Sequence, residues 1–260
     1  MLLVHGYPDD HQVFDGAVER LAADRHVVAY DTRNAGASRV TGGPADSRGV
    51  APYRLELLVE DLYAVLDATG TGTVHLVGHD WGSIQGWAAV QDPRARGRVL
   101  SYTSISGPDL GHFRRWFRTR LRSPRLWPQA GMQALRSWYV AAFQVPVLPD
   151  AAWKYLLTPR YEKFSGRKIG DSGVRGLQLY RANMFRSGDA VPDGGYAGPV
   201  HVIVPLKDPF LSPKLTSGLE ARFPRLEITE VDAGHWWPES SSGDFAVLLG
   251  RWMAKHSGAV

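Results

Sequence analysis

The sequence contains no cysteine, which excludes disulfides and every metal site built on thiolate ligands. It also has no long apolar run, because the first apolar stretch, in MLLVHGYPDD, is far too short for a signal peptide or a membrane span. No internal repeat or low-complexity linker divides the chain. These absences predict a cytoplasmic protein without a membrane span.

A chain of 260 residues with 44% hydrophobic and 22% charged residues is typical of a globular protein. This length accommodates one large α/β domain with an insertion. The net charge is only +4, and one local run, HFRRWFRTRLRSPR at 112–125, holds much of the excess.

This arginine run has two interpretations. It is either a patch for an acidic partner or nucleic acid, or an amphipathic helix whose charged face is solvated. Helical spacing favours the second interpretation. One face would carry Phe113, Trp116, Phe117 and Leu121, and the other Arg114, Arg115, Arg118 and Arg122. No nucleic-acid motif accompanies the run, so we expect no nucleic-acid partner.

Short apolar segments alternate with helical patterns along most of the chain. Buried strands of this kind, separated by helices, are typical of a mostly parallel sheet covered on both faces. The predicted strands are 2–5, 26–31, 73–78, 98–106, 199–206 and 225–231, and the predicted helices of this layer are 11–24, 53–70, 81–92 and 244–256.

The alternation stops at about Gly107 and resumes at about Gly195. The intervening segment is rich in aromatic residues, arginine and proline, and it has helical patterns but no convincing buried strand. We therefore predict an α/β core at 1–107 and 196–260, with a helical cap at 108–195 inserted between its halves.

The segment HLVGHDWGSIQG places Asp80 at the end of a predicted strand, between glycines at 78 and 82. A sharp strand-to-helix turn of this kind lifts the central side chain clear of the backbone. Asp80 could simply cap the following helix, but a cap needs no flanking glycines. We interpret Asp80 as a nucleophile.

Two later residues complete a catalytic arrangement. Asp208 and His235 each follow a predicted strand, and the order nucleophile, acid, histidine is that of α/β-hydrolases. Asp109 also follows a strand and is an alternative orienting acid, although Asp208 is favoured. The backbone N–H groups of Tyr7 and Trp81 are candidates for an oxyanion hole.

The chain resembles the epoxide hydrolases of the α/β-hydrolase superfamily over nearly its whole length. The motifs that carry the resemblance are HGYP, YDTRNAGAS, GHDWGS, KDPF and GHWWPE, together with WYVAAFQVP and YRANM in the predicted cap. In that family two cap tyrosines hold the epoxide oxygen, and Tyr139 and Tyr180 fall on their positions. GHDWG alone is less specific, because haloalkane and fluoroacetate dehalogenases share it.

The sequence departs from the family pattern in two places. The family's core normally opens with two further strands, so either the sheet is shorter than usual or the chain is truncated. Asn34 stands in RNAGAS where relatives usually have glycine. Asparagine tolerates left-handed backbone geometry, so we expect little consequence.

The resemblance implies that Asp80 opens an epoxide to form an ester, which water then hydrolyses to a vicinal diol. Neither a metal nor an organic cofactor is needed. We expect a small, apolar substrate and a monomer or homodimer. The alternatives are a dehalogenase using the same aspartate, a natural-product enzyme that opens the epoxide with another nucleophile, and a non-catalytic binding protein.

Overall fold

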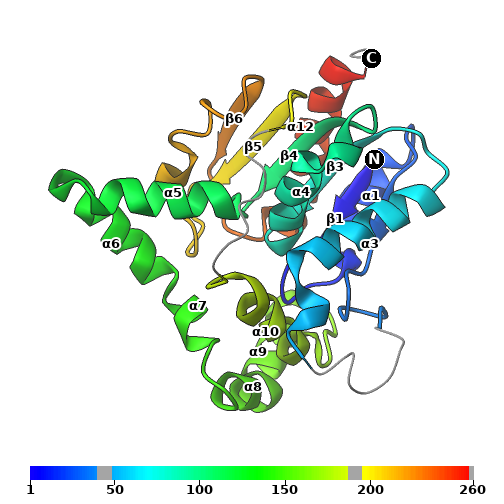
Figure 1. The fold of residues 1–260 in the computed structure, drawn as a ribbon. Helices are drawn as coiled ribbons and strands as arrows, with labels where there is room; N and C mark the ends of the chain where they lie inside the picture. The colour runs from blue at the N-terminus through cyan, green and yellow to red at the C-terminus, as the bar shows by residue number, and fades with distance from the viewer. Residues whose placement is uncertain (40–48, 187–194, 258–260) are drawn as a thin grey trace.

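A computed structural model describes residues 1–39, 49–186 and 195–257 of the chain (Figure 1). Within these residues one sheet of six parallel strands runs in the order β2-β1-β3-β4-β5-β6. The strands are β1 (Leu2–Val4), β2 (Val28–Tyr30), β3 (Val74–His79), β4 (Val99–Ile105), β5 (Val200–Pro205) and β6 (Leu226–Val231). The predicted fold class, a parallel sheet flanked by helices, is confirmed.

Helices cover both faces of this sheet. One face packs against α1 (Asp15–Leu21) and α12 (Ser242–His256), and the other against α3 (Leu55–Ala68) and α4 (Trp81–Gln91). A short helix, α11 (Trp237–Ser240), precedes α12, and single 3-10 turns occur at His11–Phe14, Ala51–Tyr53, Pro93–Ala95 and Pro213–Thr216.

The alternation of side chains along β1 divides the core in two. Leu3 faces the cluster that contains Phe14 and Phe245, whereas Leu2 and Val4 face the cluster around Trp87. Because a parallel strand inside the sheet is covered on both faces, all three β1 residues are buried. This explains why the first strand reads as an uninterrupted apolar run.

The described residues between β4 and β5 form helices and no strand, and we call residues 110–183 the cap. Its elements are α5 (Leu110–Leu121), a 3-10 turn (Pro124–Leu126), α6 (Trp127–Arg136), α7 (Trp138–Ala142), α8 (Leu148–Ala152), a π-helical turn (Trp153–Leu157), α9 (Thr158–Ser165) and α10 (Ser172–Asn183). Figure 1 shows α5 and α6 as two arms that extend away from the sheet, with α8 to α10 below it. None of the described helices is long and apolar enough to cross a membrane.

Two local expectations differ from the structure. The strand 26–31 was predicted to be buried, but β2 spans only Val28–Tyr30 and is half-buried, because it lies at the edge of the sheet. Leu121 was placed on the apolar face of a predicted helix, yet its exposed fraction is 62%. Asn34 has φ +63°, the left-handed geometry anticipated for it.

Candidate active site

Asp80 occupies a strained turn between β3 and α4. Its φ of +52° and ψ of −119° are unfavourable for a residue with a side chain. A Cβ atom on Gly78 would lie 2.4 Å from the Gly82 carbonyl oxygen, and one on Gly82 would lie 2.0 Å from the Val4 carbonyl oxygen. The two glycines therefore allow the backbone approaches that hold Asp80 in this turn.

The two carboxylate oxygens of Asp80 have different surroundings. Oδ1 accepts a hydrogen bond of 2.7 Å from the backbone N–H of Tyr7. Oδ2 lies 3.7 Å from Nε2 of His235. The Asp80 side chain is 15% exposed, whereas that of His235 is 3% exposed. Asp80 is thus the more accessible of the two to a small molecule.

Asp208 contacts the other nitrogen of His235. Its Oδ2 lies 2.9 Å from Nδ1, and its Oδ1 accepts hydrogen bonds from the N–H groups of Phe210 at 2.8 Å and Leu211 at 3.2 Å. Asp109 is engaged elsewhere, because it caps α5 and pairs with Arg222. Of the two candidate acids, only Asp208 is placed to orient the imidazole.

The pKa values of this group follow from burial and mutual charge. Burial raises the pKa of Asp80 to about 6, although His235 and the N–H groups of Tyr7 and Trp81 oppose that shift. Burial disfavours the charged form of His235, but Asp208 and Asp80 outweigh it and raise its pKa. The pKa of Asp208 is lowered because His235 and its backbone donors overcome the effect of burial.

The two candidate tyrosines come from different cap helices and meet above Asp80. Tyr139 lies on α7 and Tyr180 on α10, with ring centroids 5.8 Å apart, and Tyr180 packs edge-on against Trp81 at 5.0 Å. Burial, reinforced by the Asp80 charge, raises the pKa of both tyrosines. Both phenols therefore keep their protons at neutral pH and can donate hydrogen bonds.

One cavity of about 30 Å³ brings these side chains together. Its lining includes Asp80, His235, Tyr139 and Tyr180. The remaining lining is mainly apolar and includes Ile84, Leu110, Val140, Met184 and Leu211. In its present form the cavity has room for only one or two water molecules, so a substrate must displace side chains to enter.

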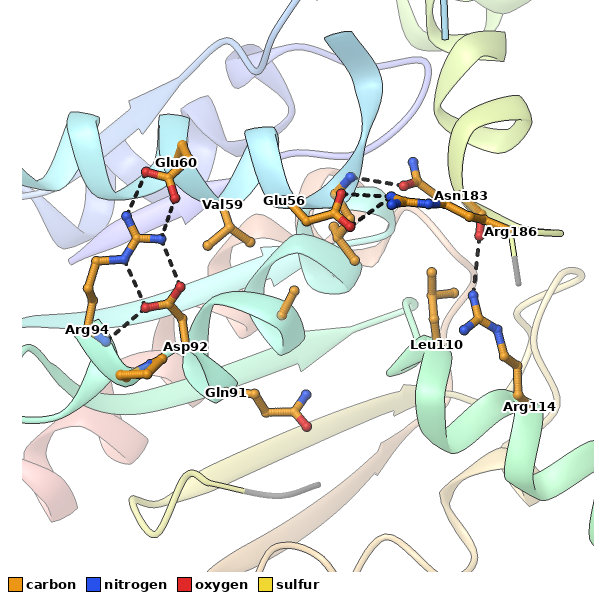
Figure 2. Close-up of a pocket in the computed structure, with 13 residues that line it drawn as sticks. Glu56, Val59, Glu60, Gln91, Asp92, Arg94, Leu110, Arg114, Asn183 and Arg186 are labelled. Carbon is orange, nitrogen blue, oxygen red and sulfur yellow. Dashed lines mark hydrogen bonds and ion pairs between the residues drawn. The ribbon is translucent and has the colours of Figure 1, made fainter. Parts of the chain in front are cut away.

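A larger pocket of about 260 Å³ lies beside this cavity and shares Leu110 with it (Figure 2). Most of its charged side chains pair with one another. Arg94 bonds both Glu60 and Asp92, and Arg186 bonds Glu56. This pocket contains none of the predicted site residues, so it is a separate feature of the surface.

Sequence reasoning missed three residues that hold the site. The fully buried His79 has its Nε2 2.9 Å from the backbone oxygen of His235, and burial lowers its pKa to about 4, so the neutral ring is the donor. Gln133 on α6 bonds the backbone of Phe210 and Ser212, and Arg136 donates to the Asp208 carbonyl. His79 lies inside the GHDWG motif, but nothing in the sequence marks Gln133 or Arg136.

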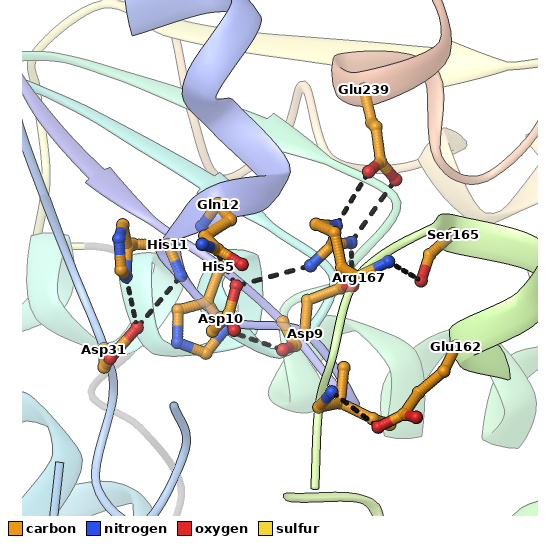
Figure 3. Close-up of polar contacts among 12 residues, drawn as sticks. His5, Asp9, Asp10, His11, Gln12, Asp31, Glu162, Ser165, Arg167 and Glu239 are labelled. Carbon is orange, nitrogen blue, oxygen red and sulfur yellow. Dashed lines mark hydrogen bonds and ion pairs between the residues drawn. The ribbon is translucent and has the colours of Figure 1, made fainter. Parts of the chain in front are cut away.

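A buried ionic cluster joins the cap to the loop that carries Tyr7 (Figure 3). Asp9 has no exposed side-chain surface and accepts bonds from Tyr161 at 2.5 Å, Arg167 at 2.6 Å and Trp236 at 3.0 Å. Arg167 also pairs with Glu239 at 2.8 Å. Because Arg167 and Tyr161 belong to the cap, these bonds fix the cap to the core beside the site.

The described residues contain no group of three or more His, Asp or Glu side chains placed to hold a metal ion. The geometry instead combines a carboxylate at a tight turn, a His–Asp pair and two phenol donors around one cavity. Such a site can support nucleophilic attack followed by hydrolysis of an ester.

Comparison with known proteins agrees with this fold. The model of the alpha/beta hydrolase fold family matches residues 1–240, and the chain belongs to that family. It is 32% identical to a mycobacterial protein named "Probable oxidoreductase EphD" (Mycobacterium tuberculosis), over 92% of this chain and 43% of the relative. It is 27% identical to mouse "Epoxide hydrolase 4", over 89% of this chain and 62% of the relative.

The chain thus spans less than two thirds of the length of these two relatives. A crystal structure of an epoxide hydrolase from Bacillus megaterium in complex with an inhibitor superposes with a TM-score of 0.77. That match covers 98% of this chain and 93% of the other at 21% identity, which shows a shared fold. Two of these three similar proteins are named as epoxide hydrolases.

The ionic cluster generates a stability prediction. We expect Arg167→Met to lower the free energy of unfolding by about 3–5 kcal/mol, because Asp9 and Glu239 would lose their cation and Asp9 would stay buried. Urea denaturation followed by circular dichroism measures the change. The control is Arg160→Met at an exposed position of α9, which should stay within about 0.5 kcal/mol of the parent protein. Equal stabilities of the two variants would contradict this role of Arg167.

Proposed function

We propose that the protein is an epoxide hydrolase in which Asp80 attacks the epoxide and water then releases a vicinal diol. The observation that carries the proposal is that Asp80, Tyr139 and Tyr180 line one cavity. A carboxylate opposite two phenol donors suits a three-membered cyclic ether, because ring opening needs a nucleophile on carbon and a proton donor on oxygen. The relatives named as epoxide hydrolases add support.

In the first step an Asp80 oxygen forms a bond to one epoxide carbon while the bond from that carbon to the ring oxygen breaks. Because Oδ1 is held by the Tyr7 N–H, Oδ2 is the oxygen available for attack. Negative charge develops on the departing ring oxygen, and Tyr139 or Tyr180 supplies it with a proton. The product is a hydroxyalkyl ester of Asp80.

In the second step His235 removes a proton from water, and the resulting hydroxide attacks the Asp80 carboxyl carbon. Asp208 stabilises the imidazolium that forms. The N–H groups of Tyr7 and Trp81 hold the oxyanion of the tetrahedral intermediate. Collapse of this intermediate expels the diol, whose oxygen takes the proton from His235. The proton left on the Asp80 carboxyl group returns to the tyrosinate formed in the first step, which regenerates both the carboxylate and the phenol.

An isotope experiment tests the covalent route. In a single turnover of styrene oxide in H₂¹⁸O, the label should enter Asp80 and not the first diol, because water attacks the ester carbonyl. His235→Gln should accumulate the ester, visible as a mass increase of the protein equal to one substrate molecule. Label in the first diol would contradict the covalent route, and release of halide from a haloalkane without epoxide turnover would favour the dehalogenase alternative.

Substitution of the tyrosines tests the proton donors. Tyr139→Phe and Tyr180→Phe should each slow ester formation by roughly 10²–10⁴-fold, because the departing oxygen loses a donor. Rapid-quench measurement of the ester gives the rate constant directly. Tyr155→Phe is the matched control, since Tyr155 is a cap tyrosine that is 72% exposed. Normal ester formation in both Tyr139→Phe and Tyr180→Phe would exclude phenol donation.

The pH dependence of ester formation tests the charge state of Asp80. The carboxylate form must attack, so its rate constant should fall tenfold per pH unit below a pKa of about 6. In His235→Gln the acid limb should move to higher pH, because His235 helps to keep the Asp80 pKa low. Stopped-flow measurement across pH 4.5–8.5 compares the two proteins. A limb that stays in place would show that Asp80 is not coupled to His235.

A further inference from the structure

Helix α6 presents its apolar side to solvent and its polar side to the protein. Met132 and Leu135 are 54% and 70% exposed, whereas Gln133 has no exposed surface. Gln133 and Arg136 bond the loop that follows β5. An amphipathic helix on a globular protein normally has the reverse orientation. The outward stripe of α6 is therefore an apolar face that no other described element covers.

This apolar face continues along neighbouring elements. We use the name "apolar edge" for six exposed residues on α6, on α7, and at the start of α8. They are Trp127, Met132, Leu135, Trp138, Val147 and Leu148, and each is more than half exposed. Figure 1 shows α6, α7 and α8 following one another along one side of the molecule. Exposed apolar side chains that gather on consecutive helices, rather than lying singly over the surface, are typical of a binding surface.

Up to Asp150 on α8, which pairs with Arg181, the charged residues in this stretch of the chain have a single sign. Residues 110–149 include seven arginines and neither aspartate nor glutamate. Arg118, Arg122 and Arg125 are exposed where α5 leads into α6. Within the described part of the chain, these three side chains have no carboxylate within ion-pair distance.

We propose that the apolar edge is a peripheral docking surface for an anionic lipid bilayer. Exposed Leu, Met and Trp side chains enter the interface between headgroups and acyl chains, while the arginines contact lipid phosphates. A second copy of the chain fits less well, because two like-charged faces would repel each other. Nucleic acid fits less well because its phosphates would leave the apolar side chains uncovered. This proposal goes beyond the proposed enzyme activity and does not depend on it.

Vesicle flotation tests the proposal with the full chain. Vesicles of phosphatidylcholine alone are compared with vesicles that contain 30% phosphatidylglycerol, a content chosen to be about that of an anionic membrane surface. We expect the protein to float with the anionic vesicles at low salt. Raising NaCl from roughly 50 to 500 mM should lower the bound fraction several-fold, because salt screens the arginines. Failure to bind anionic vesicles at low salt would overturn the proposal.

Variants separate the two contributions to binding. Met132→Ser with Leu135→Ser should reduce vesicle binding at least tenfold, and Arg118→Gln with Arg122→Gln and Arg125→Gln should remove the preference for anionic lipid. The control variant is Val247→Ser with Arg251→Gln on α12, which replaces one apolar residue and one arginine at exposed positions on the opposite side of the molecule (Figure 1). An equal loss of vesicle binding in the control variant would overturn the assignment of the binding surface to α6.

Two further measurements test whether a second copy of the chain or a nucleic acid binds the apolar edge instead. Light scattering that shows a dimer, dissociated by Met132→Ser with Leu135→Ser, would assign the edge to a second copy and overturn the proposal. Tight binding of an oligonucleotide without vesicle binding would do the same in favour of nucleic acid. Turnover of a water-soluble epoxide should be unchanged in all these variants. Loss of vesicle binding therefore stays distinguishable from a failure of the proposed function.

Discussion

The burial of one negative charge, on Asp80, is the constraint on which the rest of the site depends. A carboxylate loses most of its hydration inside a protein, and it remains ionised only if donors and cations replace the water. Here the Tyr7 N–H and the His235 ring perform that task. His235 in turn relies on Asp208, and Asp208 on backbone N–H groups. Each partner lies on a loop at the same edge of the sheet. The order of the strands therefore determines whether the ionised form of Asp80 is stabilised.

This dependence explains what could be predicted from the sequence. Asp80, Asp208 and His235 each follow an apolar strand, and parallel strands bring their carboxyl ends to one edge. Their placement could therefore be predicted, while their catalytic roles remain predictions. Tyr139 and Tyr180 were assigned only through the resemblance to epoxide hydrolases, because helical spacing cannot distinguish a phenol that faces a cavity from one that packs a core.

The features that were missed depend on contacts between distant parts of the chain. Asp9 meets Arg167 and Trp236 across more than 150 residues, and no local pattern indicates such a meeting. Leu121 lies on the predicted apolar face of α5 and is nevertheless exposed, for a related reason. Periodicity shows that a helix has an apolar face, but it does not show whether another element covers that face. The uncovered apolar face of α6 lies on the same helix that holds the Asp208 loop. The exposed surface and the site are therefore connected through α6.

The ionic cluster around Asp9 limits how freely the cap could be exchanged between related proteins. A cap is commonly regarded as a separable insertion that adjusts the substrate pocket above a constant core. In this protein Arg167 pairs with acids on two core elements, the loop that carries Tyr7 and the helix α11. A cap transferred from a relative would have to bring a cation to the same point, or the core would retain an unpaired carboxylate on the loop that carries Tyr7. The core and cap are therefore constrained to diverge together at this point, however freely the rest of the cap varies.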